Sequence, residues 1–284
     1  MGGFILPPDE TDKRLIELSP KGGKHLLKAK LVLKLGGSAI TKKDSPFTPN
    51  LEAIDRIALE IAQLIGGAGS GSVILVYGGG SFGHPVAVKH LANGVVHDAF
   101  GVAEIRGAML NLSKIITDAF LKRGVPIFVI NPSSSMTLSI DGEPSDGPWV
   151  RQVELCLERG LVPALGGDVV IDISGSARIL SGDVIARRLA KAFGASLLAF
   201  GTDVDGVMMD GQVVKEVARE DLPVLIARAS GREGDVTGGM AGKLREIEKY
   251  MQGGGGPALI FNATKPGSVA KLLGGGHLEG TYIR

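Results

Sequence analysis

The stretch Ser72-Val73-Ile74-Leu75-Val76-Tyr77-Gly78-Gly79-Gly80-Ser81-Phe82-Gly83-His84-Pro85 decides the fold, because it joins an apolar run to a glycine-rich turn. A β-branched run of this length predicts a buried strand. Four glycines remove side chains from the turn, so its backbone N–H groups are open to a ligand. Pro85 is acceptable in the first turn of a following helix. A strand, a glycine turn and a helix N-terminus form an anion site, and with His84 at its mouth we expect phosphate.

The rest of the chain alternates short apolar strands with segments of helical spacing. The expected strands are 31–35, 72–76, 125–130, 161–165, 196–200, 258–261 and 280–283, and the expected helices are 51–65, 102–122, 151–159, 184–193 and 242–251. This alternation predicts a mostly parallel sheet with helices on both faces. Segments 169–173 and 177–180 flank Ser174-Gly175-Ser176, which predicts a hairpin.

Ligands in folds of this kind bind beyond the carboxyl ends of the strands. Four of the predicted strands end there in glycine-rich turns, after Leu35, Tyr77, Leu165 and Phe200. We therefore expect the ligand site at this edge of the sheet.

Composition limits the possible functions. A chain of 284 residues with 44% hydrophobic content can bury a large core, as one α/β domain or two lobes. A net charge of +1, from 31 basic and 30 acidic residues, argues against nucleic-acid and membrane-surface partners. Cys156 is the only cysteine, which excludes an intramolecular disulfide framework and a multi-cysteine metal site.

Targeting features are also missing from the pattern. No stretch approaches 18 apolar residues without charges, so no membrane span is expected. Residues 1–30 mix prolines and glycines with scattered charges and lack the apolar region of a signal peptide. We expect a cytoplasmic protein whose residues 1–30 form a loosely ordered extension.

Two familiar phosphate motifs are matched only in part. Residues 78–83 fit G-x-G-x-x-G, but a dinucleotide fold needs an acidic residue after the next strand, and here a helical pattern continues instead. Residues 237–244 resemble a P-loop, yet they lack its first glycine and the Ser or Thr after Lys243 that would hold Mg²⁺. Neither motif predicts the function.

Charged residues beside the glycine turns are the remaining candidates. Lys34 lies inside an apolar strand, where an unpaired ammonium is costly to bury, so we expect it to face an anion or a cleft; an end that reaches solvent is the alternative. Lys43 lies in a polar loop typical of exposed charges. Lys243 opens a helix, where a cation opposes the dipole unless an anion lies between them. Asp183 is a natural N-cap for the following helix.

Structural roles are possible for several of these residues. His84 could cap its helix or complete a core hydrogen bond, although the adjacent glycines favour a phosphate contact. Asp203 and Asp205 could be turn residues only.

The sequence also resembles a known family. Lys34-Leu35-Gly36-Gly37-Ser38, followed by Ile40-Thr41-Lys42-Lys43, is similar to the N-terminal signature of the amino acid kinase superfamily. The narrower block Gly79–Pro85 resembles that of isopentenyl phosphate kinases. Further similar blocks are 181–183, 202–207, 235–240 with Lys243, and 280–283. Met208-Met209 stand where relatives often carry an aromatic residue, and the first 30 residues have no counterpart in the pattern.

The resemblance implies a fold and an activity. The fold is a three-layer αβα sandwich in two lobes, with 31–175 as the phosphate-acceptor lobe and 176–284 as the nucleotide-binding lobe. The activity is phosphorylation of isopentenyl phosphate to isopentenyl diphosphate by ATP, in an alternative mevalonate route of isoprenoid biosynthesis. Mg²⁺ bound with the nucleotide and a homodimer are also implied.

The resemblance further implies the roles of particular residues. Lys34 and Lys43 would contact the phosphates, His84 would hydrogen-bond the acceptor phosphate, and Asp183 would orient the lysines. The implied substrate-binding residues are Gly79, Gly80, His84 and Gly166. The implied ATP-binding residues are Lys34, Gly36, Gly37, Ser38, Gly80, Asp183, Asp205, Gly239 and Lys243. No residue is expected to bind a metal directly.

The chemistry agrees with these roles. A phosphate monoester has its second pKa near 6, so the nucleophile is largely deprotonated at neutral pH and needs no general base. Phosphoryl transfer depends mainly on positioning and charge stabilisation, which lysines, glycine amides and a histidine donor supply.

Two other functions remain open. One is a superfamily kinase acting on a small acid or a phosphonate, such as a fosfomycin-type kinase; the other is a non-catalytic nucleotide-binding or storage protein. A prenyl acceptor needs an apolar wall, which the sequence offers at Val86, Ala87, Val88, Leu91, Val95 and Val96, although such residues are also ordinary core.

Overall fold

The structure is a computed structural model that describes residues 29–145, 147–230, 239–273 and 278–284. Residues 1–28 of the expected N-terminal extension lie outside the described residues, as do positions 235–238 of the family resemblance. The described fold begins at Ala29, which is fully buried and whose N–H donates to the carbonyl of Phe193 at 3.1 Å.

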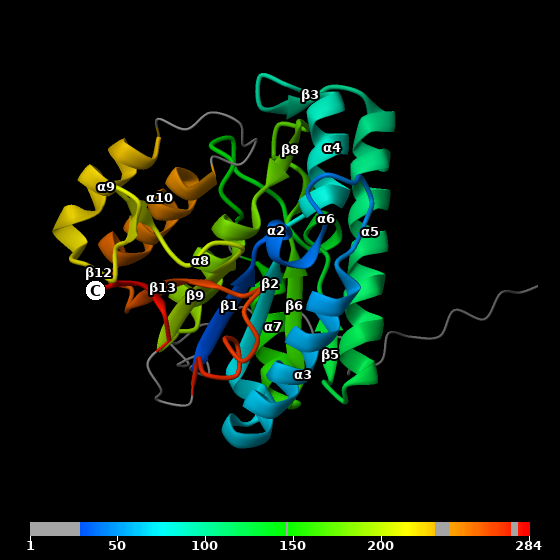
Figure 1. Ribbon diagram of the computed structural model, residues 1–284. Coiled ribbons are helices and arrows are strands. Elements are labelled where there is room, and N and C mark those ends of the chain that lie inside the picture. The colour runs from blue at the N-terminus through cyan, green and yellow to red at the C-terminus, as the bar shows by residue number, and fades with distance from the viewer. Residues whose placement is uncertain (1–28, 146, 231–238, 274–277) are drawn as a thin grey trace, which may run out of the picture.

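A single large sheet forms the centre of the molecule (Figure 1). Within the described residues its order is β12-β14-β13-β9-β1-β2-β6-β5. The strands are β1 (Leu31–Leu35), β2 (Val73–Tyr77), β5 (Ile127–Val129), β6 (Val162–Gly166), β9 (Leu197–Thr202), β12 (Glu216–Val217), β13 (Ala258–Asn262) and β14 (Gly280–Ile283). All neighbours pair in parallel except β13 and β14, which confirms the predicted, mostly parallel sheet.

Helices cover both faces of this sheet, which confirms the three-layer sandwich. Helices α3 (Leu51–Ala68) and α5 (Ala99–Lys122) pack on one face. The other face carries α7 (Pro148–Glu158), α8 (Gly182–Ala192) and α10 (Gly239–Gln252). None of the helices within the described ranges is long and apolar enough to cross a membrane.

Alternation along β1 determines where Lys34 points. Leu31, Leu33 and Leu35 pack with α3 and α5, whereas Val32 belongs to the core beneath α8. Side chains two residues apart in a strand share a face. Lys34 therefore projects toward the α8 layer rather than toward α3.

The smaller elements surround the carboxyl end of the sheet. Strands β3 (Leu91–Ala92), β4 (Val95–Val96), β8 (Ala177–Leu180) and β7 (Asp168–Ile171) form an antiparallel sheet, which confirms the hairpin predicted around 174–176. Strands β10 (Met208–Met209) and β11 (Gln212–Val213) form a separate hairpin. The other α-helices in the described residues are α2 (Gly37–Ile40), α4 (Gly80–His90), α6 (Pro132–Ser135) and α9 (Leu222–Ala229).

Two predicted helix starts are wrong. Helix α4 begins at Gly80, so Pro85 is its sixth residue rather than part of the first turn. Pro85 cannot donate to the Ser81 carbonyl, and that carbonyl instead accepts from the N–H of Phe47 at 2.9 Å. Helix α8 is capped by Ser181, whose hydroxyl accepts from the N–H of Asp183, so Asp183 lies within the first turn and is not the cap.

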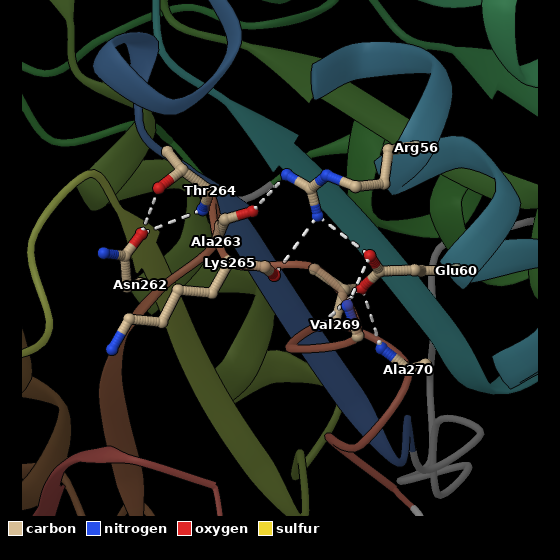
Figure 2. Close-up of polar contacts among 9 residues, drawn as sticks. Arg56, Glu60, Asn262, Ala263, Thr264, Lys265, Val269 and Ala270 are labelled. Carbon is tan, nitrogen blue, oxygen red and sulfur yellow. Dashed lines mark hydrogen bonds and ion pairs between the residues drawn. The ribbon is translucent and has the colours of Figure 1, made fainter. Parts of the chain in front are cut away.

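A buried carboxylate ties α3 to the loop that follows β13 (Figure 2). Glu60 is 5% exposed and accepts from the N–H groups of Gly267 and Val269 at 2.8 Å, and of Ala270 at 3.3 Å. Arg56 bonds the same carboxylate at 2.8 Å and donates to the carbonyls of residues 263 and 265. The first part of this loop, residues 263–270, is therefore fixed by side chains of α3.

We expect Glu60→Ala to lower the free energy of unfolding by about 3–5 kcal/mol, because it removes the carboxylate that pairs with Arg56 and accepts from three N–H groups, of which the Val269 N–H is buried. Urea denaturation measures this change. Glu52→Ala is the matched control, since Glu52 is exposed in the first turn of the same helix and its loss costs about 0.5 kcal/mol. Equal losses in the two variants would contradict the assignment.

Candidate active site

A cavity of about 1060 Å³ opens at the carboxyl ends of the central strands. It is lined by the glycine turns that follow β1 and β2, by Gly167 after β6, and by Thr202 at the end of β9. Strand β1 lies between β2 and β9: the strands next in the chain are added on the β2 side, and the later strands on the β9 side. Open α/β sheets bind ligands at such switch points.

The first two glycine turns are in contact with each other. Gly80 has φ of +48°, a conformation that favours glycine, and a Cβ placed there would overlap the side chain of Thr41. A Cβ on Gly37 would overlap the backbone of Gly80. The N–H of Ser81 donates to the Thr41 hydroxyl at 2.9 Å. The floor of the cavity is therefore backbone, which only glycine permits at these positions.

A buried carboxylate joins two lysines from distant parts of the chain. Lys34 Nζ of β1 lies 2.7 Å from Asp183 Oδ1, and Lys243 Nζ of α10 lies 3.0 Å from Asp183 Oδ2. All three residues are at most 8% exposed and all line the cavity. Lys243 also lies over the Phe200 ring, with Nζ 5.5 Å from the centroid. The cluster carries one net positive charge.

Opposing effects set the pKa of Asp183. Burial raises the pKa of this carboxyl, but Lys243 and Lys34 lower it more strongly, so it lies well below its usual range. Asp183 also lies in the first turn of α8, where the helix dipole stabilises an anion. The carboxylate is therefore charged at neutral pH and keeps both ammonium groups paired.

A second ion pair lies at the rim. Lys43 Nζ is 2.7 Å from Asp203 Oδ2, and the Ser38 hydroxyl donates to Asp203 Oδ1 at 2.7 Å. Burial raises the pKa of Asp203, but Lys43 and Ser38 outweigh it and hold this pKa below its usual value. Lys43 is 64% exposed, so its side chain can turn toward a bound anion at little cost.

The structure brings most of the sequence-predicted residues to this cavity. Those that line it are Lys34, Gly36, Gly37, Ser38, Lys43, Gly79, Gly80, His84, Asp183, Gly239 and Lys243. His84 lies half-buried in the second turn of α4, next to Gly83.

Two predicted residues lie elsewhere. Gly166 packs against the Tyr77 ring, where a Cβ would not fit, and its neighbour Gly167 lines the cavity instead. Asp205 pairs with Lys265 at 2.9 Å and accepts from Asn262 at 2.8 Å, outside the described lining.

The wall beside His84 is apolar, but it comes mainly from residues that the sequence did not single out. Of the six apolar residues predicted from α4 and the following hairpin, only Ala87 lines the cavity. Ile105 and Met109 of α5 and Ile179 of β8 supply the rest. Asp168 lies near this end; burial raises the pKa of its carboxyl despite Arg106, whose Nη1 is 3.1 Å away.

The opposite wall is formed partly by α9, a helix that sequence analysis missed. Leu225 and Ala229 of α9 line the cavity with Met209 of β10 and Met240 of α10. The signal was present in the sequence: Leu222, Leu225, Ile226 and Ala229 have helical spacing, with Pro223 in the first turn.

The described residues contain no group of three or more histidine, cysteine or acidic side chains placed to hold a metal ion. Asp183 and Asp203, which line the cavity, are both occupied by lysines.

Comparisons with known proteins agree with this geometry. Residues 29–262 match the amino acid kinase family. The isopentenyl phosphate kinase of Methanocaldococcus jannaschii is 36% identical over 262 residues, covering 89% of this chain and 97% of that protein. Its namesake from Haloferax volcanii is 36% identical over 258 residues, covering 89% and 98%.

Solved structures give the same result. An X-ray structure of isopentenyl phosphate kinase aligns with a TM-score of 0.75 at 29% identity, covering 89% of this chain and 99% of that one. The chain belongs to the amino acid kinase family, and within it to the isopentenyl phosphate kinases.

Proposed function

We propose that this chain transfers the γ-phosphoryl group of ATP to isopentenyl phosphate, giving isopentenyl diphosphate and ADP. The observation that carries the proposal is the buried Asp183 carboxylate holding Lys34 and Lys243 beside a cavity floored by glycine backbone. Such an arrangement suits two phosphate groups that must approach each other. The named relatives supply the identity of the acceptor.

The two walls suggest where each substrate lies. We place the adenosine against Met209, Leu225 and Met240, and its phosphates toward Lys243 and Lys34. The methionines would supply a polarizable apolar surface in place of an aromatic ring. This wall belongs to residues 176–284, in accord with a nucleotide-binding lobe.

The acceptor would lie at the other end, in the lobe formed by 31–175. Its phosphate would meet the N–H groups of Gly79 and Gly80 and a donor nitrogen of His84. Its five-carbon tail would lie against Ala87, Ile105 and Met109, which are all buried. Burying an apolar tail there stabilises the complex, whereas a charged tail would lose its hydration without a partner.

The reaction itself needs no proton removal. An oxygen of the acceptor phosphate forms a bond to the γ-phosphorus, the bond to the β,γ-bridging oxygen breaks, and ADP keeps that electron pair. Charge moves toward the bridging oxygen, where Lys34 and Lys243 would stabilise it. His84 would hold the acceptor in line as a hydrogen-bond donor rather than act as a base.

We propose that Mg²⁺ enters with ATP. The described acidic residues offer no ligand set of their own, and Mg²⁺ at phosphate sites keeps several waters and bonds mainly to phosphate oxygens. Its chemistry would be to offset the charge of the triphosphate.

The family resemblance also predicts a homodimer of a cytoplasmic enzyme, whose product enters isoprenoid biosynthesis. Light scattering of the purified chain tests the homodimer, with a mass twice 29.5 kDa as the expected result.

A screen of acceptors tests the activity. With ATP and Mg²⁺, we expect turnover on isopentenyl phosphate, weaker turnover on dimethylallyl phosphate, and none on fosfomycin, because the acceptor wall is apolar. ADP release coupled to NADH oxidation measures each rate. Turnover on fosfomycin alone would assign the chain to phosphonate kinases instead, and ATP binding without turnover on any acceptor would indicate a non-catalytic protein.

We expect His84→Ala to lower kcat by about 10²–10³-fold and to leave ATP affinity within about twofold, since a donor aimed at the reacting phosphate acts in the transition state. Steady-state kinetics and calorimetry measure the two quantities. His97→Ala is the control, because His97 is exposed on the loop after β4. A near-wild-type rate for His84→Ala would remove the proposed role.

We expect Asp183→Asn to lower the free energy of unfolding by about 3–5 kcal/mol, since two buried ammonium groups lose their partner. The pKa of Asp183 is depressed in the folded state, so its contribution is complete above the usual aspartate pKa of 3.8 and is lost as pH falls further. The difference between wild type and variant, from urea denaturation, should therefore be constant from about pH 8 to 5. A difference that grows as pH falls from 7 to 5 would mean that burial raises this pKa instead.

A further inference from the structure

A second buried ion pair joins the same two helices as Asp183 and Lys243. Arg187 of α8 is 7% exposed, and its Nε donates to Glu246 Oε2 of α10 at 2.6 Å. Glu246 is 8% exposed. Neither residue lines the cavity described above. Burying these two charges costs desolvation free energy, although neither residue takes a direct part in the proposed chemistry.

The spacing of the two pairs fixes how the helices align. Arg187 follows Asp183 by four residues on α8, and Glu246 follows Lys243 by three residues on α10, so both pairs lie one helical turn apart. The polarity reverses between them, with the acid on α8 in the first pair and on α10 in the second. Sliding α10 by one turn would bring Glu246 to Asp183, or Lys243 to Arg187. Like charges in contact disfavour either displacement.

Arg187 also bonds to a segment outside α8 and α10. Its Nη2 donates to Glu143, which lies in the segment between α6 and α7. Lys249 of α10 lies 3.0 Å from Glu246 and 3.8 Å from Glu143, so the four charges balance. Burial lowers the pKa of Arg187, but the two carboxylates raise it more, and the guanidinium stays charged. Its two acceptors are matched to the fixed fork of an arginine.

We propose that Arg187, acting through Glu246, is a positioning residue that sets the axial placement of α10 and thereby of the Lys243 ammonium in the nucleotide site. The inference rests on the proposed function in one respect, that Lys243 contacts the phosphates of ATP. Arg187 itself touches neither substrate. Its effect reaches the reaction only through Lys243.

A double-mutant cycle tests this route. We expect Arg187→Met to raise the Kd for Mg-ATP about tenfold in the wild-type background and by less than about twofold in the Lys243→Met background. The second effect is small because displacing α10 cannot weaken a Lys243 contact that the variant no longer makes. Isothermal titration calorimetry measures the four affinities at a temperature below the unfolding midpoint of each variant. An equal fold-loss in both backgrounds, or no loss, would overturn the proposal.

Conservative variants separate position from stability. Arg187→Lys keeps the charge but loses the fork, so we expect a Kd between those of wild type and Arg187→Met. If Arg187→Met fails to fold, Glu246→Gln replaces it, because glutamine has the shape of glutamate but lacks the charge that pairs with Arg187. The same double-mutant cycle with Lys243→Met is then measured, and we expect the same result. Arg151→Met is the matched control, since Arg151 forms a half-exposed ion pair with Glu154 on α7 and should leave ATP affinity unchanged.

The measurement also separates this inference from the proposed function. ATP affinity does not depend on which acceptor the enzyme uses. If wild-type protein binds ATP and leaves isopentenyl phosphate unmodified, the acceptor assignment fails, while the cycle still decides the role of Arg187. If wild-type protein phosphorylates isopentenyl phosphate and the cycle shows no coupling, the positioning role alone fails.

Discussion

The ion pairs of Asp183 with Lys34 and Lys243 are the constraint on which the arrangement of this protein depends. Each partner comes from a different element, and each is too deeply buried to exist as an unpaired charge. Strand β1, α8 and α10 must therefore meet at one point, which is the carboxyl end of the sheet. The cavity forms there because charged side chains, rather than apolar ones, fill the junction.

Close backbone contact is the second requirement at this junction. Gly37 and Gly80 approach until neither position has room for a Cβ, so the floor of the cavity presents backbone atoms instead of side chains. In the proposed function, these two short turns supply backbone donors that are already ordered before a ligand arrives. The cost is the entropy that glycine loses on folding, and the surrounding strands, fully buried on both faces, offset it.

Much of this site could be predicted from the sequence, and the limits have physical causes. An isolated lysine in an apolar strand and glycines after strand ends are local features, so Lys34 and the turn at 78–80 were identifiable. The partnership of Asp183 with Lys243 spans 60 residues, and no local pattern encodes it. The same holds for Ile105 and Ile179, whose place in the cavity wall follows from tertiary packing. The sequence predicts Asp183 as the helix cap because aspartate is a favoured cap residue, whereas the cap is Ser181, two residues earlier.

A carboxylate such as Asp183 would be expected to repel a phosphate bound beside it. Its benefit is in the protein without a bound phosphate. Two unit charges about 4 Å apart at an effective dielectric constant of 20 interact by about 4 kcal/mol. Without Asp183, this repulsion would push the ammonium groups of Lys34 and Lys243 apart before any phosphate arrived. With Asp183 between them the ammonium groups are already charged and placed, and the cluster still keeps one positive charge for the ligand. The repulsion between Asp183 and a bound phosphate is smaller than the repulsion between the two lysines, because the two ammonium groups beside Asp183 offset its negative charge.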